Sequence, residues 1–205
     1  MENNYQAKIE ARILSSQGGS MFIPPDFSDI AESEVVNQAL CRLQKKNTIR
    51  RVIRGVYEYP QYSGLLGEYA APSVDKVAAA LARYHGWTII PCGDTALNLF
   101  GLSTQVPAAW TYISDGPYRE YQLDRILLQF KRTTNKDISR MSYKTALLIQ
   151  AIKALGKENI DEKMRRKLAK GLRAEEKTLI LSEAQYSTAW IYSIIKKICN
   201  EGNVQ

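Results

Sequence analysis

The chain has 205 residues, with 28 Lys or Arg against 21 Asp or Glu, which gives a formal net charge of +7. Its apolar share of 45% is that of an ordinary globular protein, and it has no run of about 18 apolar residues to cross a membrane. Three widely spaced cysteines and one histidine argue against a disulfide framework or a structural zinc site. Because the first residues also lack a basic segment followed by an apolar one, we expect a cytoplasmic protein without metal or cofactor.

Charge is distributed unevenly along the sequence. Residues 1–60 carry eight basic and seven acidic side chains, residues 61–124 carry three and six, and residues 125–177 carry fifteen and six. Between Arg42 and Arg54 there are six Lys or Arg and no acid. A focused excess of positive charge is what a phosphate-lined duplex attracts, so DNA binding is the first hypothesis.

The N-terminal part predicts a helix, a strand, a short helix, a second helix and a two-stranded hairpin. Apolar residues at helical spacing predict a helix over residues 1–16, and residues 20–23 form a short extended run. Residues 27–31 leave room for about one helical turn. Ser33 is expected to cap a clearer helix over residues 33–45, in which the apolar residues line one face.

A basic hairpin follows that helix. Residues 49–54 alternate as a strand does, Gly55 supplies the turn, and residues 56–59 return. This order of elements is that of a winged helix-turn-helix. We therefore predict an α+β protein with two domains: a winged helix-turn-helix DNA-binding domain over residues 1–64, and a larger mixed α/β domain with a helical C-terminal part over residues 65–205. The glycine-rich segment 61–67 is the expected boundary.

The predicted helix and hairpin supply a set of candidate DNA-binding residues. A major groove admits one helix, whose amide and guanidinium side chains can reach base edges, and hairpin arginines can meet phosphates or the adjacent minor groove. Any single one of these residues could instead merely solvate the surface, so the hypothesis rests on the set. Its members are Ser33, Asn37, Gln38, Arg42, Lys45, Lys46, Arg50, Arg51 and Arg54.

The second domain predicts a sheet followed by helices. Helices are expected over 73–84 and 94–100, and strands over 87–92, 110–114, 119–123 and 126–131. Three more helices are expected over 142–155, 161–172 and 175–199, the last with a break near 182–187.

The predicted helix over 161–172 carries a dense basic run. Its five cations are Lys163, Arg165, Arg166, Lys167 and Lys170. A solvated helix face and a surface for nucleic acid or a protein partner are both compatible with this pattern, and both stay open.

Three segments carry a family resemblance: VVNQALCRLQKKNTIRRVIRGVYEYP (35–60), KVAAALARYHGWTIIPCGDTALNLFGL (76–102) and TAWIYSIIKKI (188–198). The first resembles the N-terminal winged helix of abortive-infection type IV antitoxins, the AbiEi-like group. The second is similar to the segment ahead of that group's antitoxin domain, and the third to its C-terminal helix. The resemblance follows the order of the family along nearly the whole chain.

The resemblance implies an antitoxin that represses its own two-gene operon through inverted repeats in the promoter. It implies a co-encoded nucleotidyltransferase-like toxin as functional partner, without a stable complex between the two proteins. It places the DNA contacts on the winged helix and the antitoxic surface on residues 163–170. Our leading hypothesis is therefore a non-enzymatic, DNA-binding antitoxin of a bacterial type IV toxin–antitoxin system for phage defence.

Two other functions stay open. One is a stand-alone winged-helix transcriptional regulator whose second domain senses a ligand or mediates assembly. The other is a DNA-processing enzyme that uses Asp115 and Lys131, because an acid followed later by Gln129-x-Lys is similar to the arrangement in metal-dependent nucleases. One carboxylate and one amide are a poor ligand set for a hard cation, which weakens this alternative.

Two more residues have simple structural interpretations. Asp94 follows a glycine after a predicted strand and is expected to cap the next helix, which is simpler than an anion site there. Cys41 has no second thiol predicted beside it, so it is interpreted as a small apolar residue.

Overall fold

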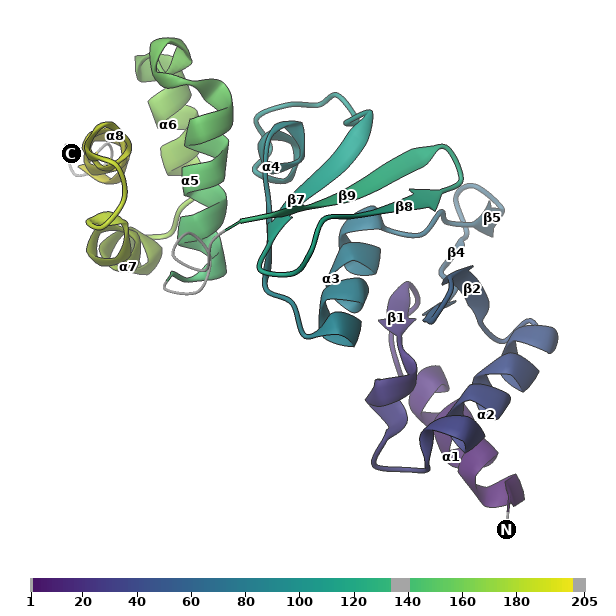
Figure 1. Cartoon of the computed structure of the whole chain (residues 1–205). Helices are drawn as coiled ribbons and strands as arrows, with labels where there is room; N and C mark the ends of the chain where they lie inside the picture. The colour runs from purple at the N-terminus through teal and green to yellow at the C-terminus, as the bar shows by residue number, and fades with distance from the viewer. Residues whose placement is uncertain (1, 134–140, 201–205) are drawn as a thin grey trace. The chain divides into compact units, whose positions relative to one another are not determined.

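The structure is a computed structural model that describes residues 2–133 and 141–200. Helices and strands of several sheets are mixed along the chain, so the predicted α+β fold class is confirmed (Figure 1). The chain forms two compact units, Met1–Gly86 and Trp87–Gln205, and each is described by itself. No helix within the described ranges is long and apolar enough to span a membrane.

The N-terminal unit contains the helices and strands predicted for residues 1–60, one further hairpin, and the helix that the sequence predicts at the start of the second domain; its short helix shares only Phe27 with the predicted turn 27–31. Its elements in chain order are α1 (Glu2–Leu14), β1 (Ser20–Phe22), the 3-10 helix η1 (Pro24–Phe27), α2 (Ser33–Lys45), β2 (Arg50–Ile53), β3 (Val56–Tyr59), β4 (Tyr62–Ser63), β5 (Glu68–Tyr69) and α3 (Val74–His85). The short helix begins at Pro24, earlier than expected, because proline suits the first turn of a helix. The β4–β5 hairpin occupies the segment that the sequence predicts as a linker.

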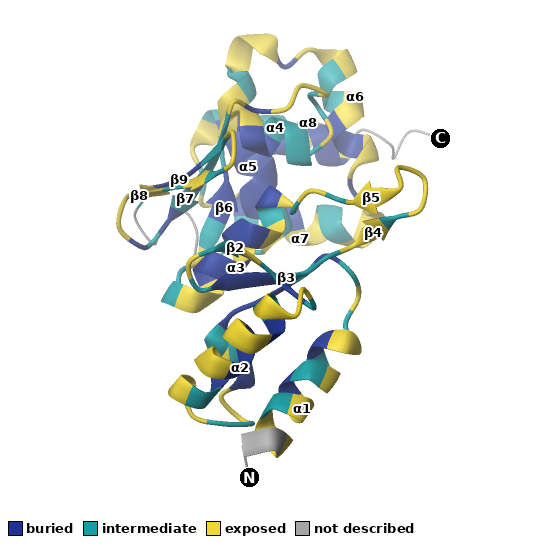
Figure 2. Cartoon of the chain, turned by 90° about the vertical axis from the view of Figure 1, so that its right-hand side faces the viewer, coloured by how far each residue is buried: buried dark blue, intermediate teal, exposed yellow. Residues whose placement is uncertain are grey.

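Strands β1, β3 and β2 form one antiparallel sheet in that order, with β3 in the centre. Phe22 and Tyr57 are cross-strand neighbours, and both belong to the core that α1 and α2 bury with Ile9, Leu40 and Leu43. Successive side chains of a strand point to opposite faces, so Met21 and Glu58 point away from that core, to the side where α3 crosses β1 and β3. The sheet therefore has helices on both faces (Figures 1 and 2).

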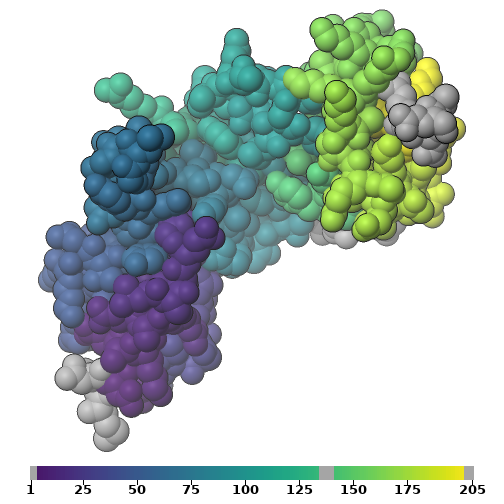
Figure 3. Space-filling model, turned by 180° about the vertical axis from the view of Figure 1, so that it is seen from behind, coloured from purple at the N-terminus to yellow at the C-terminus, as the bar shows by residue number. Residues whose placement is uncertain are grey.

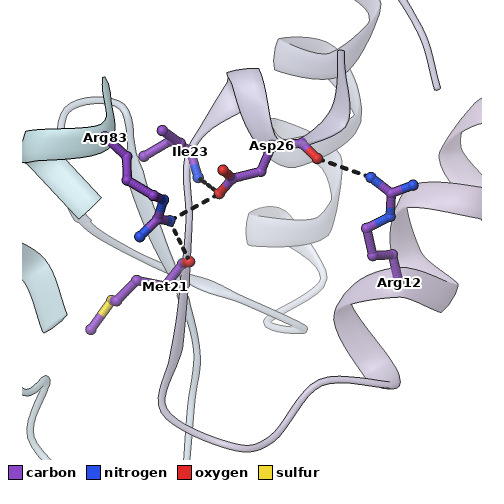
Figure 4. A network of polar contacts seen from close by, with 5 residues as sticks. All are labelled: Arg12, Met21, Ile23, Asp26 and Arg83. Carbon is purple, nitrogen blue, oxygen red and sulfur yellow. Dashed lines mark hydrogen bonds and ion pairs between the residues drawn. The ribbon is translucent and has the colours of Figure 1, made fainter. Parts of the chain in front are cut away.

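Helix α3 belongs to this unit because polar contacts join it to the first strand and to η1 (Figure 4). Arg83 donates to the Met21 carbonyl at 3.2 Å and to the Asp26 carboxylate at 3.1 Å. Asp26 also accepts from the Ile23 amide, and Arg12 of α1 donates to the Asp26 carbonyl, both at 2.9 Å. The compact unit therefore ends at Gly86, later than the domain boundary predicted at residue 64.

Two predicted helix caps are wrong, for one shared reason. Helix α2 has Glu32 at its N-cap position, without a side-chain cap bond, so Ser33 lies inside the first turn. Helix α4 has Gly93 at that position, so Asp94 is likewise its first helical residue. A cap needs the residue just before the helix, and each helix begins one residue earlier than the sequence indicates.

The C-terminal unit joins a mixed sheet to a group of helices. Its elements are β6 (Ile89–Pro91), α4 (Asp94–Leu99), β7 (Ala109–Ser114), β8 (Arg119–Leu123), β9 (Ile126–Arg132), α5 (Tyr143–Leu155), η3 (Lys157–Asn159), α6 (Glu162–Lys170), α7 (Ala174–Ala184) and α8 (Ala189–Asn200). The sheet order is β6-β7-β9-β8, with β7 and β9 parallel and the other pairs antiparallel. The predicted break near residues 182–187 is confirmed by the gap between α7 and α8.

Helix α5 links the sheet to the last three helices. It packs on β6 and α4 on one side and on α7 and α8 on the other (Figure 1). Its first turn is held by Glu183 of α7, which accepts from the Ser142 amide at 3.0 Å and from the Ser142 hydroxyl at 2.8 Å. Burial acts to raise the pKa of Glu183, but hydrogen bonds from Thr145 and Ser142 outweigh it and hold that pKa below its usual range. A charged Glu183 therefore joins the helices.

Candidate nucleic-acid interface

Helix α2 has one buried face and one polar face. Val36, Leu40 and Leu43 are fully buried against α1, η1 and the sheet. All six of the predicted DNA-binding residues on and just after this helix are exposed: Ser33, Asn37, Gln38, Arg42, Lys45 and Lys46. Because helix residues three and four positions apart lie on one face, the apolar spacing that seals the core also turns these residues outward.

The polar face of α2 has a central stripe, and Arg42 lies beside it. Glu34, Gln38, Cys41 and Lys45 recur at helical spacing and are all exposed, so they form the stripe opposite the core. Arg42 lies to one side, where its guanidinium donates to Gln6 of α1 at 3.4 Å. Cys41, interpreted from the sequence as a small apolar residue, lies exposed in the middle of this outward stripe.

The end of α2 brings its last cations close to β2 along the chain. The Lys46 amide bonds back to the Arg42 carbonyl, and the Thr48 amide to the Leu43 carbonyl, both at 3.0 Å. Asn47 adopts a left-handed conformation with φ of 58°, which a short polar side chain tolerates. This hydrogen-bonded turn connects the basic end of α2 directly to the basic strand β2.

The two adjacent arginines of β2 have different positions. Arg51 pairs across the sheet with Tyr57, so it projects on the side of α1 and α2, and it is exposed. Arg50 pairs with Glu58 and projects on the opposite side. There its guanidinium forms an ion pair with Glu58, whose side chain is 3% exposed, and donates to the Ala70 carbonyl. Because Arg50 neutralises a buried carboxylate, we now expect Arg51 rather than Arg50 to be available for phosphates.

Arg54 stands at the turn of the β2–β3 hairpin. Arg54 and Gly55 are the two residues between the strands, and Arg54 is exposed. Gly55 has a φ of 81°, a conformation that L side chains disfavour. A Cβ at this glycine would lie 3.7 Å from the ring of Tyr84 in α3, so the turn is short and lies against that helix.

The basic run of the second unit forms a stripe on α6. Lys163, Arg166, Lys167 and Lys170 are exposed and recur at helical spacing, whereas Leu168 and Ala169 are buried on the core side. Arg165 is half-buried and stands apart from the stripe. Arg166 pairs with the exposed Glu162, and the Lys167 ammonium donates to the Leu102 carbonyl at 3.2 Å. We call these four exposed residues the α6 stripe.

Comparison with known proteins identifies the family. Residues 8–180 match the model of a family described as Family of unknown function (DUF6088). The chain belongs to the DUF6088 family. No curated protein and no solved structure matches this DUF6088 chain. The family description carries no function, so the resemblance of the DUF6088 chain to abortive-infection antitoxins stays a prediction.

Of the residues of the enzyme alternative, Asp115 has a structural role in this DUF6088 protein. The Asp115 carboxylate accepts the Thr88 amide at 2.9 Å, and Gly116 lies so close to the Trp87 ring that an added Cβ would be 2.4 Å from it. Lys131 is exposed on β9, where its charge opposes the effect of burial, which raises the pKa of the Cys92 thiol. Within residues 2–133 and 141–200, no three His, Cys, Asp or Glu gather as a metal-binding group.

One surface feature of the DUF6088 chain is missed by the sequence reasoning. The β4–β5 hairpin carries Leu65 and Leu66 at its tip, exposed by 95% and 67%. The segment Tyr62–Tyr69 places two aromatic residues symmetrically around Gly-Leu-Leu-Gly, a spacing that could have indicated a hairpin instead of a linker.

Proposed function

We propose that residues 1–86 form a winged helix-turn-helix that binds duplex DNA, with α2 as the recognition helix and the β2–β3 hairpin as the wing. The order α1, β1, η1, α2, β2, β3 supports this proposal, as does a three-stranded sheet with β3 in its centre. Helices η1 and α2 supply the two helices of the helix-turn-helix, and residues 28–32 connect them.

The observation that carries the proposal is a set of cations that the protein itself leaves unneutralised. Lys45, Lys46, Arg51 and Arg54 are exposed, and none of them forms an ion pair within the described ranges. These four exposed cations lie within ten residues of one another in the chain, and an anionic partner would offset their mutual repulsion. A phosphate backbone supplies such a partner over the length of α2 and its turn.

The polar residues of α2 divide into two roles under this proposal. Asn37 and Gln38 lie on the outward side of the helix, ahead of the cations, where amide side chains can form paired hydrogen bonds to adenine. Arg42, Lys45 and Lys46 lie toward its end and meet phosphates, which fix the position of the helix in the groove. Arg51 and Arg54 extend the phosphate contacts to the wing.

A salt titration of the full chain on DNA tests the proposal. Fluorescence anisotropy with a labelled fragment of its own promoter and with an unrelated duplex is measured between 50 and about 200 mM salt. We expect binding to both duplexes at low salt, tighter binding to the promoter, and a steep loss of affinity with salt. Absence of binding to either duplex at the lowest salt contradicts the proposal.

The amide residues have their own test in the same assay. Asn37→Ala and Gln38→Ala should each reduce the preference for the promoter over the unrelated duplex, by about 1–3 kcal/mol for a lost paired contact. The salt dependence should stay unchanged, since no charge is removed. An equal loss of affinity for both duplexes would place these residues outside the base contacts.

The cellular role that we propose is that of a type IV antitoxin that represses its own operon. This role rests on the resemblance of residues 35–60, 76–102 and 188–198 to abortive-infection antitoxins, and on the α6 stripe as the surface for neutralisation. The test is co-expression with a nucleotidyltransferase-like protein encoded by a neighbouring gene. Growth rescue by the chain supports the role, and a gene neighbourhood without such a toxin favours a stand-alone regulator.

The α6 stripe can be tested against a control variant that loses the same number of positive charges. Changing Lys163, Arg166, Lys167 and Lys170 together to Ala should abolish rescue while leaving promoter binding unchanged. The matched control changes Lys153, Lys157, Lys196 and Lys197 to Ala, because these are also exposed helical or near-helical lysines of the same unit. Equal rescue by the two variants would remove the stripe from the antitoxic surface.

A further inference from the structure

The β4–β5 hairpin of the N-terminal unit is held in place by specific contacts. Tyr62 pairs with Tyr69 across the hairpin, and their rings meet edge to face with centroids 5.4 Å apart. The turn is closed by the Gly67 amide on the Ser63 carbonyl at 2.9 Å, and the base by the Ala70 amide on the Gln61 carbonyl at 2.8 Å. The donation from Arg50 to Ala70 joins this base to the central sheet.

The tip of this ordered hairpin is apolar and bare. Leu65 is 95% exposed and Leu66 is 67% exposed, while Tyr62 and Tyr69 behind them are 59% and 61% exposed. In Figure 2 the hairpin stands out from the rest of the N-terminal unit as an exposed element, and in Figure 3 the same segment forms a blue lobe. Large apolar side chains concentrated in this way mark an interaction site.

The charge of the segment disfavours a nucleic acid as its partner. Residues 55–75 contain no Lys or Arg, and they contain the acids Glu58, Glu68 and Asp75. A DNA-binding arm needs cations to meet phosphates, and here the nearest ones in sequence are Arg54 and Lys76. The hairpin tip is therefore suited to an apolar surface on a protein.

A hollow of about 540 Å³ lies at the base of the same hairpin. Leu14, Tyr59, Pro60, Tyr62 and Tyr69 supply its apolar and aromatic walls, and the remaining lining residues are small or uncharged polar ones. No charged residue lines it, although 24% of the chain is charged. Protein interfaces have this composition, with tyrosine enriched and charges depleted at the centre.

We propose that two copies of the chain associate through this face, with the Leu65–Leu66 tip of each copy in the hollow of the other. A chain of net charge +7 repels its own copies, so an uncharged face is where they can approach closely. Because the tip and the hollow lie on the same unit, a two-fold axis satisfies both contacts at once. The proposal is independent of DNA binding.

The size of the contact sets the strength of the association. A stable dimer buries about 800 Å² on each partner, which is more than two leucines and two half-exposed tyrosines provide. We therefore expect a weak dimer, whose dissociation constant is on the order of micromolar.

Sedimentation equilibrium of the full chain over a range of concentrations tests the association. The wild-type mass should rise from monomer to dimer, and Leu65→Ser/Leu66→Ser should raise the dissociation constant at least about tenfold. The matched control is Val106→Ser/Leu179→Ser, because these residues are 74% and 48% exposed in the other unit. Both double variants remove exposed side chains, and circular dichroism checks that each is folded.

A disulfide test locates the contact. Chains that carry Leu65→Cys are mixed with chains that carry Ser16→Cys in the hollow, both in a Cys41→Ser background to remove the exposed native thiol. A covalent heterodimer should form under mild oxidation, since a disulfide requires the two Cα atoms within about 7 Å. The control partner carries Glu34→Cys, which is exposed on α2 of the same unit.

Four outcomes overturn the proposal. One is a monomer at every concentration, and another is a dimer that the tip variant leaves intact. The third is cross-linking of Leu65→Cys to Glu34→Cys as efficiently as to Ser16→Cys. A tip variant that loses DNA binding with no change of mass would assign the hairpin to DNA, and this also contradicts the proposal.

Discussion

The two hairpins of the N-terminal unit follow one another in the chain, and they differ in chemistry. The β2–β3 hairpin is basic, with Arg51 and Arg54 exposed, and its turn lies against α3 at Tyr84. The β4–β5 hairpin has no cation, its tip is apolar, and a Cβ added at Gly64 or Gly67 would meet no atom within 4 Å. One hairpin is suited to a polyanion and the other to an apolar protein surface.

Arg50 explains how both hairpins are held in one unit. Its guanidinium contacts Glu58 of the first hairpin and the Ala70 carbonyl at the base of the second. The neighbouring Arg51 makes no such contact and is exposed. Adjacent residues of the same type thus have different tasks, because the pleat of the strand sends them to opposite faces. The experiments that follow test this division, from the largest expected effect to the smallest.

Removal of Arg50 should have the largest effect. Arg50→Ala leaves the carboxylate of Glu58 buried without its partner, and we expect the free energy of unfolding to fall by about 3 kcal/mol. Arg51→Ala should change it by less than about 0.5 kcal/mol, since that side chain is exposed. Urea denaturation measures both values. Glu58→Gln in the Arg50→Ala background should recover part of the loss, and failure to recover it would show that the buried charge is not the cause.

Removal of the two exposed arginines should affect binding and leave stability intact. Arg51→Ala/Arg54→Ala should weaken binding to every duplex by about tenfold at physiological salt. The slope of log binding constant against log salt concentration should become shallower by about two. The melting temperature should stay within a degree or two of wild type, because neither residue forms an ion pair within the described residues. The Leu65→Ser/Leu66→Ser variant is the comparison, and it should keep wild-type DNA affinity. An unchanged slope after the arginine changes would place the wing outside the DNA contact.

Substitution of the turn glycines separates backbone strain from function. Gly55 and Gly67 have φ values of 81° and 69°, so alanine at either should lower the free energy of unfolding by about 1 kcal/mol. Only Gly55→Ala should also weaken DNA binding, because it alters the turn that carries Arg54. Equal DNA affinities for the two variants would argue against the assignment of the wing.

The smallest effect on the free energy of unfolding is expected at Gly64. Alanine there should stabilise the protein, whereas alanine at Gly55 or Gly67 should destabilise it. The φ of Gly64 is not positive, and a Cβ there would meet no atom of the described residues within 4 Å. Gly64→Ala should therefore raise the free energy of unfolding by about 0.5 kcal/mol, chiefly by restricting the unfolded chain. Thermal denaturation measures the change, and a loss of stability would indicate that the turn differs from the one described.

The elements that the sequence predicts well are those whose pattern is local. Val36, Leu40 and Leu43 recur at helical spacing, and this alone places α2 and its exposed polar face. The β4–β5 hairpin escapes such reasoning, because strands of two residues are too short to have a period and glycines suggest a linker.

The different tasks of Arg50 and Arg51 could not be predicted from the sequence. Counting back from the turn pairs Ile53 with Val56 and would bring Arg51 opposite Glu58. The register shifts between Arg51 and Ile53, so Arg50 instead of Arg51 pairs with Glu58 across the strands. An irregularity of this kind moves every preceding side chain to the other face, and no residue type marks it in advance.

The contacts of α3 could not be predicted from the sequence either. Arg83 meets Asp26 across 57 positions of sequence, a separation at which patterns of neighbouring residues carry no information. The glycines and serine of segment 61–67 indicate a boundary there, whereas the packing places it after Gly86.

The crossing of α3 over β1 and β3 has a practical consequence for anyone who wishes to isolate the N-terminal unit. A fragment cut at residue 64 would lack Lys76 and Arg83, which hold the carbonyls of Gly19 and Met21, and would leave one side of the sheet uncovered. Such a fragment is prone to aggregate, and its failure to bind a promoter would say nothing about the whole protein. Truncation should therefore fall beyond Gly86.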